Sequence, residues 1–208
     1  MSVLAFDIET RLLASEVEKE YAAELAGASA WERPDLFGFA VGVIVDVDTS
    51  VPRYYGPEQA REMIAALREA EATVGFNSAG FDFGVLEAYG DVAAIYPRHL
   101  DLRLEIKAAL RASPEAAASG QKLYAGSLDA ICGANDLGGK TGSGADAPEL
   151  YRSGRIPELL AYCEADTRLT ASLYRLLGEG LLQVEPSYYS DGERTSLGRR
   201  ISISLQPR

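Results

Sequence analysis

Short apolar runs alternate along the chain with segments whose apolar residues recur at helical spacing. The run 3–8 is short and continuous, which predicts a buried strand. A longer apolar run covers 36–47, and after a polar turn a further run covers 51–55, a pattern typical of an antiparallel hairpin. Two more strands are expected at 73–76 and 95–102.

Helical periodicity and capping signals predict helices between these strands. Ser15 and Glu18 have the spacing of a capping box, for a helix that continues to about residue 26, and Pro57 is expected to open the next helix. The other helices are expected at 81–89, 104–110, 123–134 and 157–177, with loops at 112–122 and 135–147. A hairpin followed by strand–helix units predicts an α/β fold with a mixed β-sheet flanked by helices.

The composition changes near residue 180, which predicts a main domain of residues 1–180 and a C-terminal tail of residues 181–208. The tail contains a Ser-Asp-Gly turn after a tyrosine pair, and is expected to form a β-hairpin or an arm. Its last part, 194–208, contains four arginines and no acid. These arginines are explained by binding of phosphate, by pairing with the acidic body, or by contact with another subunit or a protein partner.

The 208-residue chain is strongly acidic, with 20 Lys+Arg against 31 Asp+Glu. Because phosphate neutralisation by Lys and Arg dominates non-specific binding of nucleic acid, this balance excludes a broad basic face. A polyanion would therefore have to be bound at one local site, by a few basic side chains or by bound metal.

Cysteine content and targeting signals narrow the class of protein further. The two cysteines, Cys132 and Cys163, are far apart, which argues against a disulfide framework and against a cysteine zinc site. No signal peptide and no apolar stretch of membrane-spanning length is recognised. A cytoplasmic protein without a membrane partner is therefore expected.

The first predicted strand ends with a pair of acids. Asp7 and Glu9 stand two residues apart, so their side chains face the same way, roughly 7 Å apart. Two carboxylates on one face of a buried strand repel each other unless a cation neutralises them, and Mg²⁺ or Mn²⁺ takes such oxygen ligands. Alone, the pair is also explained by a strand that runs out into solvent.

Two further acids lie in predicted helices. Asp82 follows Asn77 and Phe81 at the start of a helix, where the helix dipole by itself favours an acid. Tyr162 and Asp166 lie four residues apart in the last helix, so they share a face. Each pattern alone is also found in ordinary amphipathic helices.

Together, the Asp-x-Glu, Asn-x-x-x-Phe-Asp and Tyr-x-x-x-Asp motifs, in this order, resemble those of the DEDD superfamily of 3′–5′ exonucleases, in its tyrosine (DEDDy) branch. The nearest resemblance is to the proofreading exonuclease domain of family-B DNA polymerases and its stand-alone bacterial relatives. It covers about residues 3–178 and leaves the insertion at 11–33 and the tail unexplained. The histidine branch has His where this chain has Ala161, and the single histidine, His99, is expected to be structural.

The resemblance implies a ribonuclease H-like fold and a two-metal mechanism. Two divalent ions, Mg²⁺ or Mn²⁺, would be held by Asp7, Glu9, Asp82 and Asp166, and Tyr162 would hydrogen-bond to the attacking water. Because a tyrosine ordinarily titrates near pH 10, orientation of the water is the expected role rather than general-base catalysis.

Substrate contacts are expected from Thr10, Asn77, Phe81 and Lys140, with Phe81 stacking on a terminal base and Lys140 reaching a phosphate. Lys140 lies in a near-match to the phosphate-binding P-loop pattern at 134–141. A P-loop needs a preceding strand and a following helix, whereas a helix-like segment precedes this one and glycines follow it. A P-loop nucleotidase is therefore rejected.

The predicted function is metal-dependent hydrolysis of phosphodiester bonds at the 3′ end of nucleic acid, with single-stranded DNA favoured. Two alternatives stay open. One is a non-catalytic module that binds nucleic acid or protein on the same fold. The other is an RNA-directed exoribonuclease resembling ribonuclease D, which shares every motif quoted and differs in contacts to the 2′-hydroxyl.

Overall fold

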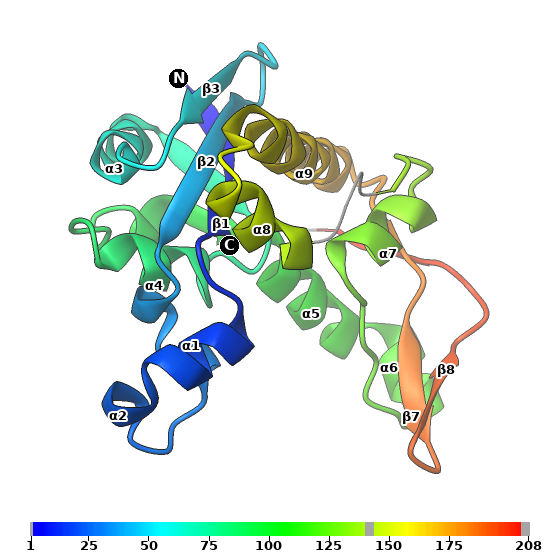
Figure 1. The fold of residues 1–208 in the computed structure, drawn as a ribbon. Helices are drawn as coiled ribbons and strands as arrows, with labels where there is room; N and C mark the ends of the chain where they lie inside the picture. The colour runs from blue at the N-terminus through cyan, green and yellow to red at the C-terminus, as the bar shows by residue number, and fades with distance from the viewer. Residues whose placement is uncertain (1, 140–143, 205–208) are drawn as a thin grey trace.

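A five-stranded mixed sheet forms the centre of the molecule (Figure 1). The computed structural model describes residues 2–139 and 144–204. The strands, in chain order, are β1 (Val3–Thr10), β2 (Phe39–Asp46), β3 (Pro52–Tyr55), β4 (Ala72–Gly75) and β5 (His99–Asp101). Their order in the sheet is β3-β2-β1-β4-β5, with β2 antiparallel to β1 and β3, and β4 parallel to β1 and β5. The α/β class, the mixed sheet and the 36–55 hairpin are confirmed.

Helices cover both faces of this sheet. The α-helices are α1 (Ala14–Glu20), α2 (Ala22–Leu25), α3 (Ala60–Glu69), α4 (Asp82–Glu87), α5 (Leu102–Ala112), α6 (Pro114–Ser119), α7 (Leu128–Ala134), α8 (Ala147–Arg152) and α9 (Ile156–Gly178). Short 3₁₀ helices are η1 (Ala30–Glu32), η2 (Pro34–Leu36), η3 (Tyr96–Arg98) and η4 (Gly144–Asp146). One core cluster joins Phe6 of β1 to residues of α3 and α4, and a second joins Ala5 to α5, α7 and α9. Adjacent residues of β1 thus pack on opposite faces, as the strand period requires.

Local hydrogen bonds displace two helix starts from their predicted positions. The first helix begins at Ala14, because the Leu13 backbone N–H donates to the Glu16 carboxylate over 2.8 Å, so Ser15 as the cap was wrong. Pro57 does not open α3, since it lies in a turn in which the Gln59 side chain accepts the Gly56 N–H. The prediction that one helix continues to residue 26 was also wrong, because α1 and α2 are separate.

The region before α9 also differs from the expected loop and helix. The predicted loop 112–122 contains α6, because Ser113 caps it by accepting the Ala116 N–H over 3.1 Å. The helix expected at 123–134 is reduced to α7. Residues before it are held extended because Tyr124 forms an antiparallel bridge with Ser187.

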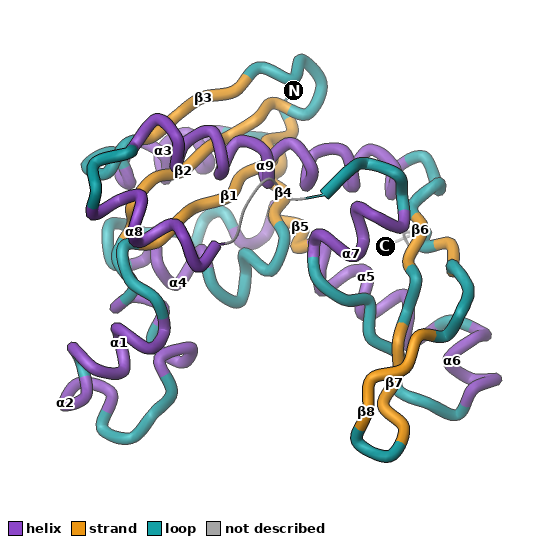
Figure 2. The backbone as a smooth tube through the Cα atoms, turned by 45° about the vertical axis from the view of Figure 1, so that its right-hand side comes forward, coloured by secondary structure: helices purple, strands orange, loops and turns teal. Residues whose placement is uncertain are grey.

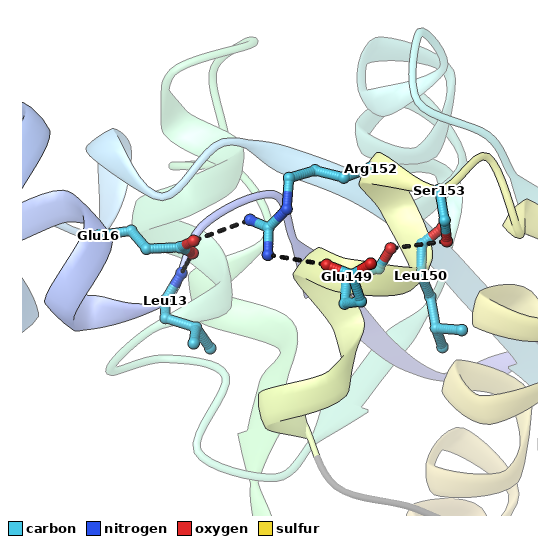
Figure 3. A network of polar contacts seen from close by, with 6 residues as sticks. All are labelled: Leu13, Glu16, Glu149, Leu150, Arg152 and Ser153. Carbon is cyan, nitrogen blue, oxygen red and sulfur yellow. Dashed lines mark hydrogen bonds and ion pairs between the residues drawn. The ribbon is translucent and has the colours of Figure 1, made fainter.

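The insertion at 11–33 forms α1, α2 and η1, and a side-chain network fastens it to α8 (Figure 3). Arg152 donates to the Glu16 carboxylate over 2.8 Å and to Glu149 of its own helix over 3.5 Å. Arg11, the first residue of the insertion, has its guanidinium carbon 5.1 Å from the ring centroid of Tyr151. The insertion therefore buttresses α8, which in turn packs on α9 and β1.

The tail contains two small antiparallel pairs, β6 (Gln183–Val184) with β9 (Ile201–Ser202), and β7 (Ser187–Ser190) with β8 (Glu193–Ser196). The turn between β7 and β8 has positive φ at Asp191 and Gly192, as two-residue hairpin turns require. In both views this hairpin and the α1–α2 pair project from the lower part of the molecule on opposite sides (Figure 2). In the described part of the chain, no helix has the length and apolar character to cross a membrane.

Candidate active site

The acidic pair of β1 faces α9. Phe6 and Ile8 pack into the core cluster beneath α3 and α4, so the alternating residues Asp7 and Glu9 point to the opposite face. Glu9 is only 8 % exposed, so the strand does not run out into solvent at this point.

The thiol of Cys163 in α9 lies beside the acidic pair of β1. It donates to the backbone carbonyl of Asp7 over 3.3 Å, and the potential ligand atoms of Cys163, Asp7 and Glu9 all lie within 4.8 Å of one another. Burial raises the pKa of this thiol well above its usual value, and the charges of Asp7, Glu9, Asp166 and Asp82 raise it further. Asp7 and Glu9 therefore lie beside this thiol, and the charges of Asp166 and Asp82 also act on it, so Cys163 is a neighbour of the acids that sequence reasoning missed.

Asp82 is buried at the start of α4, with 5 % of its surface exposed. Burial raises the pKa of this carboxyl to about 7, backbone N–H donors of Asp82 and Ile8 oppose the rise, and the nearby charge of Asp101 adds to it. At neutral pH without a cation, this acid is thus poised between its two protonation states.

Asp101, which was not among the predicted residues, shapes the turn that carries Asp82. Its carboxylate accepts the backbone N–H groups of Asn77 and Ala79, each over 3.0 Å, and it also caps α5 by accepting the Arg103 N–H over 3.0 Å. Asn77 has a left-handed φ of 67°. Asp is an ordinary capping residue, but Asp101 was not found as a cap because it lies inside the strand expected at 95–102, whereas α5 begins directly after it.

One cleft of about 680 Å³ brings together all the predicted catalytic residues and two of the predicted substrate contacts. These residues are Asp7, Glu9, Asp82, Tyr162 and Asp166, with Asn77 and Phe81. Tyr162 and Asp166 are 8 % and 2 % exposed, on the face of α9 that packs against the sheet. We call the four carboxylates the acidic side of the cleft.

One predicted substrate contact, Thr10, does not line this cleft. The ladder between β1 and β2 shifts register between Glu9 and Thr10, which breaks the alternation of the strand. The Thr10 hydroxyl donates to the Leu12 carbonyl over 3.0 Å, and Thr10 is not one of the described residues that line the cleft. Lys140 lies outside the described residues. The segment before it is helix α7, so the structural context of a P-loop is missing, as predicted.

His99 is structural, as expected. Its two ring nitrogens lie 2.9 Å from the Thr73 hydroxyl and 2.8 Å from the Ser78 hydroxyl, and its ring packs on Phe6 and Phe83. Burial lowers the pKa of this imidazole to about 4, so it is neutral at physiological pH.

The same cleft is also lined by five basic side chains, four of which sequence reasoning missed, since only Arg194 was among the expected phosphate contacts. Arg103, Lys107 and Arg111 follow one another at four-residue intervals on one face of α5, and Lys122 and Arg194 complete the set. We call these five residues the cationic side. The spacing in α5 was visible in the sequence, whereas the position of Arg194 was not, because it depends on how the tail packs.

A scan of protein-family models and a search of curated proteins gave no match to this chain. The arrangement of the cleft is therefore the main guide to function.

Proposed function

We propose that this chain is a metal-dependent 3′–5′ exonuclease that hydrolyses phosphodiester bonds, with single-stranded DNA as its favoured substrate. The observation behind the proposal is the meeting of four carboxylates with Tyr162 in one cleft. They come from β1, α4 and α9, in the chain order of the DEDDy motifs. The mixed sheet flanked by helices supports the ribonuclease H-like fold that the resemblance implies.

The burial of the acids favours a functional explanation over an ordinary solvated strand end. Glu9, Asp82 and Asp166 are all nearly inaccessible. Like charges gathered in a place of low dielectric constant raise the free energy of the folded state unless they are protonated or neutralised. A cluster of this kind is costly to keep without a cation.

The donor set fits hard divalent cations. Carboxylate oxygens are the ligands preferred by Mg²⁺ and Mn²⁺, and Cys163 stays a protonated hydrogen-bond donor rather than a soft thiolate ligand. Asp7, Glu9 and Asp166 would hold one ion, and Asp7 with Asp82 the second. When bound, such ions supply a nucleophilic water at neutral pH and offset charge on the attacking and leaving oxygens.

The chain's own groups supply orientation. Tyr162 lies one helical turn before Asp166, so its hydroxyl is suited to aim the attacking water by a hydrogen bond. Phe81 lines the same cleft, where its ring is available to a terminal base. The cationic side provides the local positive charge that an acidic chain requires to hold a polyanion.

The proposal is tested with matched single-stranded DNA, duplex DNA and RNA, each labelled at the 5′ end, in Mn²⁺, in Mg²⁺ or in EDTA. We expect single-stranded DNA to be shortened stepwise from its 3′ end only when metal is present. Faster loss of RNA would instead support the RNA-directed alternative. Tight binding of all three with no hydrolysis would support the non-catalytic module.

A further inference from the structure

The hairpin β7–β8 is attached to the cleft rather than hanging free. The backbone N–H of Tyr124 donates to the Ser187 carbonyl over 2.8 Å, and the Ser187 N–H donates back over 3.0 Å. The segment 122–126 and the hairpin thus form one continuous edge of the cleft. We call this edge, with its side chains, the C-terminal clamp.

Two tyrosines of this clamp present aromatic surface to the cleft. The rings of Tyr124 and Tyr189 lie 5.4 Å apart, edge to face, and both residues line the cleft. The Lys122 amine lies 5.2 Å from the centroid of the Tyr124 ring. Tyr189 is 53 % exposed, although tyrosine has a large apolar ring that burial would favour. An exposed ring at the rim of a cleft is available for a flat apolar ligand group to stack upon.

Arg194 is held in place beside these rings. Its Nε donates to the Ser187 hydroxyl over 2.7 Å, and its guanidinium packs over Gly126, where an added Cβ would lie 3.7 Å from Nη2. Arg103, Lys107 and Arg111 face the same cleft from α5.

The pairing of these cations differs from that of several arginines elsewhere in the chain. Arg33, Arg152 and Arg168 form ion pairs with carboxylates at 2.7 to 2.8 Å. Arg200 of the tail also pairs, with Asp136 at 3.6 Å. Among the described residues, no ion pair joins a carboxylate to any of the five residues of the cationic side. In a chain of net charge −11, this leaves positive charge concentrated at one place.

We propose that the C-terminal clamp holds an unpaired nucleic-acid strand on its way to the carboxylates. Bases stack on Tyr189 and Tyr124, and phosphates contact Arg194 and the cations of α5. Aromatic platforms beside a basic groove suit a single strand, because a duplex hides the base faces that stacking requires. The identity of the ligand rests on the proposed exonuclease function. The clamp gives the tail a role in recognition, in which Arg194 takes part and Arg200 does not.

The first test measures binding to a 5′-fluorescent, 12-nucleotide single-stranded DNA in EDTA, so that hydrolysis does not compete. Tyr189→Ala is expected to weaken binding by about 5- to 100-fold, the range for loss of one stacking platform, whereas Tyr189→Phe keeps the ring and the affinity. Arg194→Ala is expected to weaken binding and to flatten the salt dependence of log K by about 0.7. Arg199→Ala removes the same charge from an exposed tail position outside the cleft and serves as the matched control.

The second test separates the clamp from the chemistry, by comparing hydrolysis in Mn²⁺ of the same DNA and of the p-nitrophenyl ester of thymidine 5′-monophosphate. Tyr189→Ala and Arg194→Ala are expected to lose kcat/KM by the same factors on the DNA and by much less on the ester, because the ester is a single nucleotide and offers the clamp no neighbouring base or phosphate. Equal losses on both substrates, or no loss on either, would overturn the clamp. If the wild type hydrolyses neither substrate, the exonuclease proposal fails, while the binding test still decides on the clamp.

Discussion

The acidic and cationic sides of the cleft come from different parts of the molecule and differ in how deeply their charges are buried. The acidic side comes from β1, α4 and α9, which form the core of the fold, and most of its carboxylates are buried. The cationic side comes from α5, the segment 122–126 and the tail, and its basic residues are all exposed. Buried charges interact strongly with one another, whereas exposed charges are screened by water and salt.

This difference separates what each side contributes. Changes on the acidic side are expected to alter stability and catalysis together, because the same burial that concentrates the carboxylates makes them repel one another. Changes on the cationic side are expected to alter substrate affinity and leave the fold intact.

The largest effect is expected from Asp7→Asn. Loss of one carboxylate shared by both proposed ions should lower exonuclease activity by about 10³-fold or more. Without metal, relief of carboxylate repulsion should raise the melting temperature, and added Mn²⁺ should stabilise the variant less than the wild type. Thermal melts with and without millimolar Mn²⁺, with activity on single-stranded DNA, check both. Glu18→Gln, an exposed acid of α1, is the control. Full activity of Asp7→Asn, with no Mn²⁺ effect on the wild-type melt, would contradict the metal site.

Tyr162→Phe should reduce kcat by about 10- to 100-fold, as expected for a group that orients a reacting water without holding the metal itself. The ring still packs, so the melting temperature and its increase on adding Mn²⁺ should match the wild type. Single-turnover rates on DNA measure the loss of catalysis, and thermal melts with and without Mn²⁺ measure the stability and the metal response. Wild-type turnover would remove Tyr162 from the mechanism, and a variant that unfolds would show a purely structural tyrosine.

The pH dependence of stability distinguishes the buried acid from the buried imidazole. The folded-state pKa of Asp82 is about 7, above its ordinary 3.8, so this group lowers stability as pH rises from about 4 to 7. The folded-state pKa of His99 is about 4, below 6.5, so that group lowers stability as pH falls from 6.5 to 4. Between about pH 4 and 6.5 the two contributions oppose each other.

Asp82→Asn removes only the first contribution. Its free energy of unfolding in EDTA should therefore rise with pH, relative to the wild type, by up to about 1.4 kcal/mol per pH unit between pH 4.5 and 6.5. Urea unfolding at four pH values measures this slope. Parallel profiles of the variant and the wild type would mean that Asp82 titrates normally in the folded protein.

The smallest effect is expected on the cationic side. Lys107→Ala should weaken binding of single-stranded DNA by a few-fold and reduce the salt slope by about 0.7, with no change in melting temperature, because the side chain is exposed. Lys19→Ala, an exposed lysine of α1 outside the cleft, is the matched control. A change in stability without a change in the salt slope would place Lys107 in the structural framework instead.

Local periods in the sequence determined which side chains share a face. Asp7 and Glu9 lie on one face because side chains in a strand alternate with a period of two residues. Tyr162 and Asp166 lie on one face because a helix completes a turn in slightly fewer than four residues. Element boundaries were less predictable. The Leu13 cap and the register shift that removes Thr10 from the cleft depend on individual hydrogen bonds and on strand pairing, which composition and period do not encode.

The meeting of the motifs depends on tertiary packing. The Cys163 thiol contacts Asp7 across 156 residues of chain, and Arg194 reaches the cleft because the tail pairs with the segment before α7. Such contacts exist because the whole core packs in one arrangement, whereas a local pattern constrains only neighbours along the chain. For the same reason, the sequence excluded a broad basic face from the net charge, but the concentration of five cations at one cleft became visible only once distant segments were placed side by side.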